Sequence, residues 1–383
     1  MTVTTRSQPQ PRRPFRSGAG VALSSTSDLW GRVDELVSPA RSLRDLRAHR
    51  LQFLAADYWR RIGVPVPEDL LLEERNLALR QLAADVLLRK VRDAVTGTIV
   101  IFKGPEAAAH YPVPELRPFA DIDLLVPKPE EAHRVLLSAG FVANGNTEDY
   151  YAGLQHVQPL RWPTLPLSVE LHHYPNWVEW TAPPSAAQLF GDLVPARVGP
   201  PGVSALDPTK HALVLAVNSW ADVPMRRALD LIDIAAVLGS LDPATVQPLA
   251  DDWGVGRIWR TTTSAINHVL FGARRPASMR TWGRATASVR DATVAEDHLR
   301  RLASVFWALP LHRAAGLFAR RLVGQLMPSE DESWRPKLRR TLFALKNPSR
   351  RRSDHDRLLG DDAHRFPRGA RRGPIAGEPE SSD

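Results

Sequence analysis

The chain of 383 residues contains no cysteine, which excludes disulfides, thiolate nucleophiles and cysteine-ligated zinc sites. Long apolar runs are missing too: residues 212–217 and 304–311 fall far short of the ~20 residues that a membrane-spanning helix needs. Residues 1–25 are rich in Ser, Thr, Pro and Arg and lack the apolar segment of a secretory signal. We therefore expect a soluble, cytoplasmic protein with a disordered N-terminus.

Positive charge is concentrated near the C-terminus. The formal net charge is +8, and residues 335–372 alone carry thirteen Arg or Lys against four acids. The remainder of the chain is close to neutral. We expect residues 347–383 to form a disordered basic tail, and nucleic-acid binding by this tail stays an alternative. Phe366 is the only aromatic residue in the tail, whereas single-stranded nucleic acid is usually bound by several stacking aromatics.

Apolar periodicity predicts an α+β chain with helices at both ends and strands in the middle. Residues 67–94 repeat apolar side chains every three or four positions, as in an amphipathic helix. Short β-branched or apolar runs indicate strands, and from Asp207 onward nearly every segment has helical spacing. The expected helices are 43–62, 67–94, 129–139, 208–220, 225–238, 243–253, 258–271 and 297–327 with a break at Pro310, and the expected strands are 98–102, 121–126, 156–162 and 167–171.

This pattern predicts a division into five parts. The fold class that we expect is a small mixed sheet with helices, preceded by an N-terminal helix pair and followed by a mostly helical C-terminal half. The expected parts are a disordered N-terminus (1–25), N-terminal helices (26–96), a central α/β core (97–205), a helical C-terminal domain (206–346) and a basic tail (347–383).

Two carboxylates in one strand are the main chemical signal. Side chains alternate between the faces of a strand, so Asp121 and Asp123 project to one side and Ile122 and Leu124 to the other. Such neighbouring carboxylates repel unless one is protonated or a cation lies between them, and Mg²⁺ prefers oxygen ligands. The alternative is a solvated strand face, which the otherwise apolar surroundings disfavour because unpaired buried charge is costly.

A third acid and a basic turn extend this signal. Glu170 lies among apolar residues in a second strand candidate, and three converging carboxylates could hold two metal ions. Lys103 and Gly104 form a turn after a buried strand, where ligand sites gather in α/β folds. Glycine lets a backbone approach phosphate closely, and lysine supplies positive charge.

These motifs together resemble a known family. The order Ile-Phe-Lys-Gly104, Arg117-Pro-Phe-Ala-Asp-Ile-Asp-Leu-Leu-Val126 and Val-Glu170-Leu-His is similar to the uncharacterised nucleotidyltransferase family of the DNA polymerase β superfamily. The resemblance runs from about Asn76 to Leu238 and implies a polymerase β-like core. It implies transfer of a nucleoside monophosphate from an NTP, ATP among them, to an acceptor hydroxyl or phosphate, with release of pyrophosphate.

The resemblance also implies roles for individual residues. Two Mg²⁺ ions, or Mn²⁺ in their place, would be bound by the three acids, and Glu170 would ligate the ion that activates the acceptor. The chain departs from the family pattern in having Lys-Gly where Gly-Ser is usual and Glu in place of the commoner third Asp. The residues assigned in this way are Asp121, Asp123 and Glu170 for catalysis and metal, and Lys103, Gly104 and Arg117 for phosphate.

Several assignments stay open. Asp233, on a helix similar to the family's C-terminal helical segment, could meet the nucleotide or form a salt bridge. For His172 and His173 we expect a structural role beside the site, since a zinc site would need a second cluster. Nothing in the chain identifies the acceptor, for which a small molecule or peptide is favoured over RNA. A toxin-like or tRNA-modifying transferase, and a degenerate nucleotide- or partner-binding domain, are the competing functions.

Overall fold

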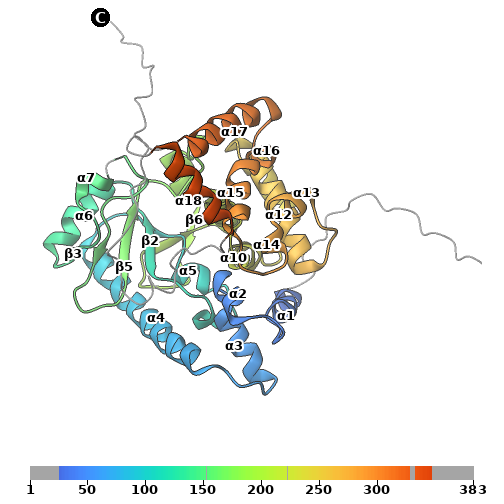
Figure 1. The fold of residues 1–383 in the computed structure, drawn as a ribbon. Helices are drawn as coiled ribbons and strands as arrows, with labels where there is room; N and C mark the ends of the chain where they lie inside the picture. Colours follow the sequence, from blue (N-terminus) through green and yellow to red (C-terminus); the bar gives the residue numbers. More distant parts are fainter. Residues whose placement is uncertain (1–25, 152, 222, 328–332, 347–383) are drawn as a thin grey trace, which may run out of the picture. The chain divides into compact units, whose positions relative to one another are not determined.

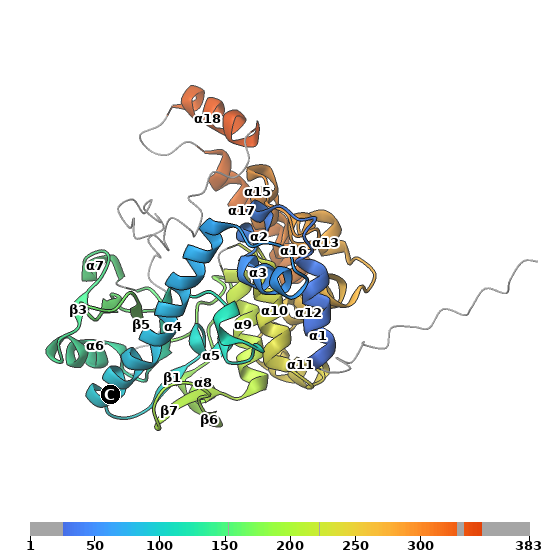
Figure 2. The same cartoon turned by 90° about the horizontal axis from the view of Figure 1, so that it is seen from below.

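The computed structural model describes residues 26–151, 153–221, 223–327 and 333–346, all within one compact unit, Met1–Ser349. The predicted disordered ends, residues 1–25 and 347–383, lie outside the described residues. The α+β class is confirmed: within the described residues, seven strands form one mixed sheet, and helices precede, interrupt and follow them. Figures 1 and 2 show most helices of the C-terminal half on one side of the strands. The predicted domain boundaries remain predictions.

The N-terminal segment is helical, as predicted, but it forms four helices instead of a pair, and the helix expected over residues 43–62 is interrupted at residues 49–51. Ser42 caps the second of its helices by accepting a hydrogen bond from the Asp45 amide, and Pro67 precedes the fourth. The long fourth helix ends at Ala94, shortly before Gly97, which has a positive φ. These helices are α1 (Thr26–Leu36), α2 (Leu43–Ala48), α3 (Gln52–Arg61) and α4 (Glu68–Ala94).

The sheet has the strand order β3-β4-β5-β2-β1-β7-β6. In its centre, β2 pairs with β5 in parallel and with β1 in antiparallel orientation, and β1 pairs in parallel with β7. The strands are β1 (Ile99–Ile101), β2 (Asp121–Leu125), β3 (Val142–Ala143), β4 (Leu160–Arg161), β5 (Ser168–His172), β6 (Leu193–Pro195) and β7 (Val203–Leu206). Short helical segments connect them: α5 (Pro105–Ala108), η1 (Pro114–Leu116), α6 (Pro129–Ser138), α7 (Glu148–Tyr151) and α8 (Ala186–Phe190).

The two faces of the sheet belong to different hydrophobic cores. Ile101, Ile122, Leu124 and Val169 pack with buried residues of α4 and α6. On the other face, Val100, Phe102 and Leu125 pack with the helical C-terminal half. Because strand side chains alternate, Asp121, Asp123 and Glu170 belong to this second face.

The C-terminal half is built around two almost completely buried helices. In α9 (Pro208–Ala221) and α10 (Ala228–Leu238) nearly every described side chain is buried, and the two pack against each other. Their apolar sequence explains this placement, because a helix that is hydrophobic on all sides is stable only inside a core. Around them lie α11 (Pro243–Asp252), α12 (Gly256–Phe271), α13 (Ala277–Thr281), α14 (Arg284–Ala287), α15 (Val294–Ala303), α16 (Val305–Ala308), α17 (Leu311–Leu326) and α18 (Trp334–Lys346).

Candidate active site

The parallel pairing of β2 with β5 brings the three predicted acids to one place. In this register Asp123 lies opposite Glu170, and Asp121 lies opposite Ser168. Directly paired residues of neighbouring strands project to the same face, so the carboxylates of Asp121, Asp123 and Glu170 share it. Asp123 is buried, and Asp121 and Glu170 are half-buried.

His172 joins this group from the same face of β5. Its Nε2 lies 3.0 Å from Asp123 Oδ1 and 3.6 Å from Glu170 Oε2. The ligand atoms of Asp123, Glu170 and His172 all lie within 4.8 Å of one another. Both ring nitrogens of His172 are buried and have no partner with hydrogen-bond geometry among the described residues. A buried imidazole in that state, beside two carboxylates, suits a metal ion, so the donor set fits one.

The charges of the cluster set its protonation. The pKa of Asp121 is raised to about 7. Burial is the largest cause, the negative charges of Asp123 and Glu170 also raise this pKa, and the positive charge of Lys103 lowers it. Burial alone would lower the pKa of His172, but the nearby carboxylates of Asp123 and Glu170 outweigh it, and the pKa is raised. Positive charge is therefore favoured where the carboxylates meet, in the form of a proton or of a cation that replaces it.

Lys103 contributes a permanent positive charge to the cluster. Its Nζ lies 3.4 Å from Asp123 Oδ1, and its side chain is 25% exposed. Burial alone would raise the pKa of Asp123, but the positive charges of Lys103 and His172 and the hydrogen bond from Lys103 outweigh burial, and the pKa lies below its ordinary value. Lys103 can therefore neutralise Asp123 and still face a ligand from its exposed side.

Gly104 is required where it stands. Its φ of +56° is strained for residues with a side chain, and a Cβ atom built there would lie 2.9 Å from the carbonyl oxygen of Asp121. The turn therefore packs directly against the first residue of β2. This close approach fixes the distance between Lys103 and the carboxylates.

Arg117 is predicted to contact phosphate, and Asp233 is predicted to meet the nucleotide or to form a salt bridge. In the structure the two residues form a buried ion pair with each other. Arg117 Nε and Nη2 donate to Asp233 Oδ1 and Oδ2, both at 2.8 Å, and Tyr111 donates its hydroxyl to Asp233 Oδ1 at 2.6 Å. Arg117 Nη1 also donates to the carbonyl oxygen of Gly104 at 3.1 Å. Both charged side chains are less than 10% exposed. The salt bridge that the sequence leaves open for Asp233 is therefore confirmed, and Arg117 holds the Lys103–Gly104 turn in place. Contact of either residue with a phosphate or nucleotide stays a prediction.

Two histidines near the cluster have other partners. His156 lies 4.0 Å from Glu170 through its Nε2, and its Nδ1 lies 2.8 Å from the carbonyl oxygen of Val157. His211 donates from Nε2 to the carbonyl oxygen of Phe102 at 2.8 Å, which ties α9 to the end of β1. His172, for which the sequence predicts a structural role beside the site, instead lies within the acidic cluster and is a candidate ligand. Its spacing of two residues from Glu170 places both side chains on one face of β5.

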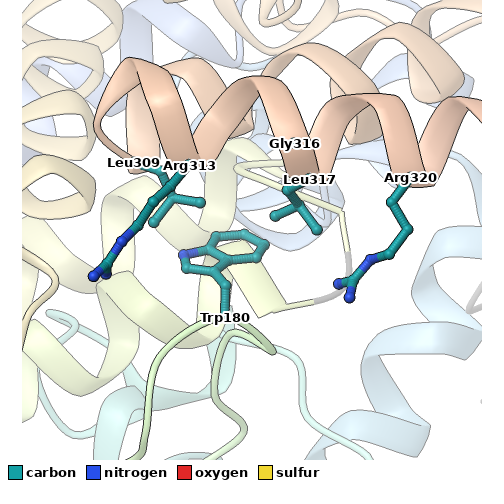
Figure 3. A pocket seen from close by; sticks show the side chains of 6 residues that line it. All are labelled: Trp180, Leu309, Arg313, Gly316, Leu317 and Arg320. Carbon is teal, nitrogen blue, oxygen red and sulfur yellow. The ribbon is translucent and has the colours of Figure 1, made fainter.

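A separate hollow of about 230 Å³ lies beside Trp180, below α17. Figure 3 shows the indole ring between two arginines of that helix, Arg313 and Arg320. Leu309, Gly316 and Leu317 complete its lining, which contains no carboxylate. The hollow therefore shares no residue with the acidic cluster.

Comparison with known protein families matches residues 37–271 to the uncharacterised nucleotidyltransferases. This match covers more than half of the chain and includes every residue of the cluster, so the chain belongs to the uncharacterised nucleotidyltransferase family. Neither a curated protein nor a solved structure matches the chain. Across the described residues, none of the helices combines the length and apolarity needed to cross a membrane.

Proposed function

We propose that this protein transfers a nucleoside monophosphate from an NTP to an acceptor hydroxyl or phosphate. In this reaction the acceptor oxygen bonds to the α-phosphorus, the bond from that phosphorus to the bridging oxygen breaks, and pyrophosphate leaves. The acceptor proton passes to water. The observation that carries the proposal is the meeting of Asp121, Asp123 and Glu170 on one face of β2 and β5, beside Lys103.

Asp121, Asp123, Glu170 and His172 would hold the metal. Carboxylate oxygens suit Mg²⁺ and Mn²⁺, and the imidazole favours Mn²⁺ over Mg²⁺ at its position. The ion supplies charge stabilisation at the phosphates and activation of the acceptor oxygen. One or two ions are compatible with four ligands, and two are proposed by analogy with the family.

The protein itself contributes positioning. Lys103 offers its ammonium to the phosphates, and Gly104 allows the backbone to approach them closely. Because the turn is held by Arg117, its position does not depend on the ligand. With charge preorganised in this way, the nucleoside monophosphate can be transferred directly to the acceptor, without a covalent intermediate on the protein. A small-molecule or peptide acceptor is proposed over RNA.

Thermal unfolding with each NTP, with and without Mg²⁺, tests the proposal. The wild type should be stabilised by one NTP only when Mg²⁺ is present, by about 2.7 kcal/mol at a concentration 100 times Kd. The Asp121→Asn/Asp123→Asn variant should lose this effect. Because Asp123 is paired with Lys103 and His172, the variant can be less stable without ligand, and its response to NTP and Mg²⁺ is therefore measured relative to its own unliganded melting temperature.

A matched variant separates the site from general charge effects. Asp251→Asn/Asp252→Asn removes two exposed acids at the end of α11 and should keep the full response. Absence of stabilisation by every NTP in the wild type would overturn the transferase proposal and favour the degenerate, partner-binding alternative.

A further inference from the structure

The helix α18 leaves large apolar side chains in contact with solvent. Trp334 and Leu338 are each 60% exposed, and Leu342 is 51% exposed. Because these residues are spaced four apart on a helix, they form one stripe along it. The helix contacts α15, but since the stripe stays exposed, this contact does not cover it. An apolar stripe of this kind marks a surface that another surface covers.

Only positive charge accompanies the stripe. The sequence of α18, WRPKLRRTLFALK, contains five basic residues and no acid. Residues 347–353 add three arginines, again without an acid. The nearest acids in the sequence precede the helix, at residues 330–332. A helix with an apolar stripe and a cluster of four to eight Lys or Arg has the composition that binds anionic lipid surfaces.

The cations flank the stripe on both sides. With about 3.6 residues per turn, Arg335 and Arg339 follow it along one side and Lys337 along the other. Both arginines are exposed and the lysine is half-buried, and none of the three has an ion-pair partner among the described residues. Their long stems can lie against apolar surroundings while the charged heads bind anions.

The charge decides between the surfaces that could cover the stripe. Pairing with α18 of a second copy would bring together two helices that carry positive charge only, and these repel each other. Nucleic acid matches the charge, but it engages aromatic side chains by stacking and would give Leu338 and Leu342 no apolar partner. An anionic lipid surface offers phosphates to the cations and acyl chains to the stripe.

We propose that α18 docks the protein on a membrane surface that contains anionic phospholipids. The helix lies in the plane of the surface, the leucines enter the boundary between headgroups and acyl chains, and Trp334 lies at the headgroup level. Arg335, Lys337 and Arg339 bind lipid phosphates. The association is peripheral, because a helix of 13 residues is too short to span a bilayer. The inference does not depend on the proposed function.

Sedimentation of the full chain with lipid vesicles tests the proposal. The wild type should pellet with vesicles of phosphatidylcholine and phosphatidylglycerol in equal parts, less so as salt is raised, and should not pellet with phosphatidylcholine alone. Trp334→Ser/Leu338→Ser/Leu342→Ser keeps every charge and should lose affinity for the mixed vesicles by at least about tenfold. Arg335→Gln/Arg339→Gln keeps the stripe and should lose about as much.

Leu72→Ser/Leu79→Ser/Leu82→Ser is the matched control. It removes three apolar side chains of similar exposure from α4, a helix that carries charges of both signs, and should bind the mixed vesicles like the wild type. No binding by the wild type, or an equal loss in this control, would overturn the proposal. Wild-type affinity in the serine variant of α18 would overturn it too, because charge alone would then act, as for nucleic acid. A wild-type dimer that becomes a monomer in that variant would instead assign the stripe to a second copy.

Discussion

At the scale of single residues, some members of the candidate site could be predicted from the alternation of side chains along a strand, and others could not. Asp121, Asp123 and Glu170 could be predicted because charged residues in apolar strands are costly unless they have a function. Their convergence depends on the parallel pairing of β2 with β5, which a sequence pattern does not specify. His172 follows the same alternation as Glu170, yet its importance appears only when its Nε2 is found 3.0 Å from Asp123.

Gly104 allows a test of local geometry. Gly104→Ala should lower the free energy of unfolding by about 2 kcal/mol or more, since it adds left-handed strain and a contact at 2.9 Å with the Asp121 carbonyl. Urea denaturation measures the change. Gly97→Ala is the control, because Gly97 also has a positive φ (+88°) but its added Cβ meets nothing within 4 Å. If both variants lose the same unfolding free energy, the close approach of Gly104 to the Asp121 carbonyl does not contribute to the cost.

At the scale of elements, most of the predicted helices and central strands are present, with boundaries shifted by a few residues. The hairpin of β6 and β7 was not predicted. Its residues include Pro195 and the Gly199-Pro-Pro-Gly202 turn, which suggest irregular structure until β7 is seen beside β1. Local sequence patterns predict where strands lie, but they do not determine which strands far apart in the sequence pair with each other.

The ion pair between Arg117 and Asp233 is an example of such long-range pairing, because it joins α10 to the segment before β2. Arg117→Met should cost about 3–5 kcal/mol of unfolding free energy, since it leaves the Asp233 carboxylate buried without its partner. Arg117→Met/Asp233→Leu should recover part of this loss, as chemical denaturation would show. A double variant less stable than the sum of the two single changes would contradict the pairing.

At the scale of the whole molecule, His49 joins the N-terminal segment to the C-terminal half. Its Nδ1 accepts a hydrogen bond, so the buried ring must stay neutral, and burial lowers the pKa of His49 to about 4. The unfolded chain binds this proton near pH 6.5. The contribution of His49 to stability is therefore present above pH 6.5 and is lost as the pH falls toward 4, by up to about 3 kcal/mol.

Comparison of wild type with His49→Gln measures this effect. The variant should be less stable at pH 7 by about 1–3 kcal/mol, because the buried hydrogen bonds are disturbed. Its unfolding free energy should nevertheless fall less steeply between pH 6.5 and pH 4.5. If the unfolding free energies of the two proteins fall equally with pH, protonation of His49 does not contribute to the loss of stability in acid.

The position of β2 as the middle strand of seven has a consequence for exchange with solvent. Its backbone amides are covered by β1 on one side and β5 on the other, so deuterium can replace their hydrogens only when the sheet opens. Fraying at the short edge strands β3 and β6 leaves the carboxylates undisturbed. An ion bound between β2 and β5 stabilises the closed sheet and therefore slows the exchange of every amide that is exposed only when the sheet opens. The affinity of the ion can then be measured from the exchange rates of backbone amides that are remote from its ligands.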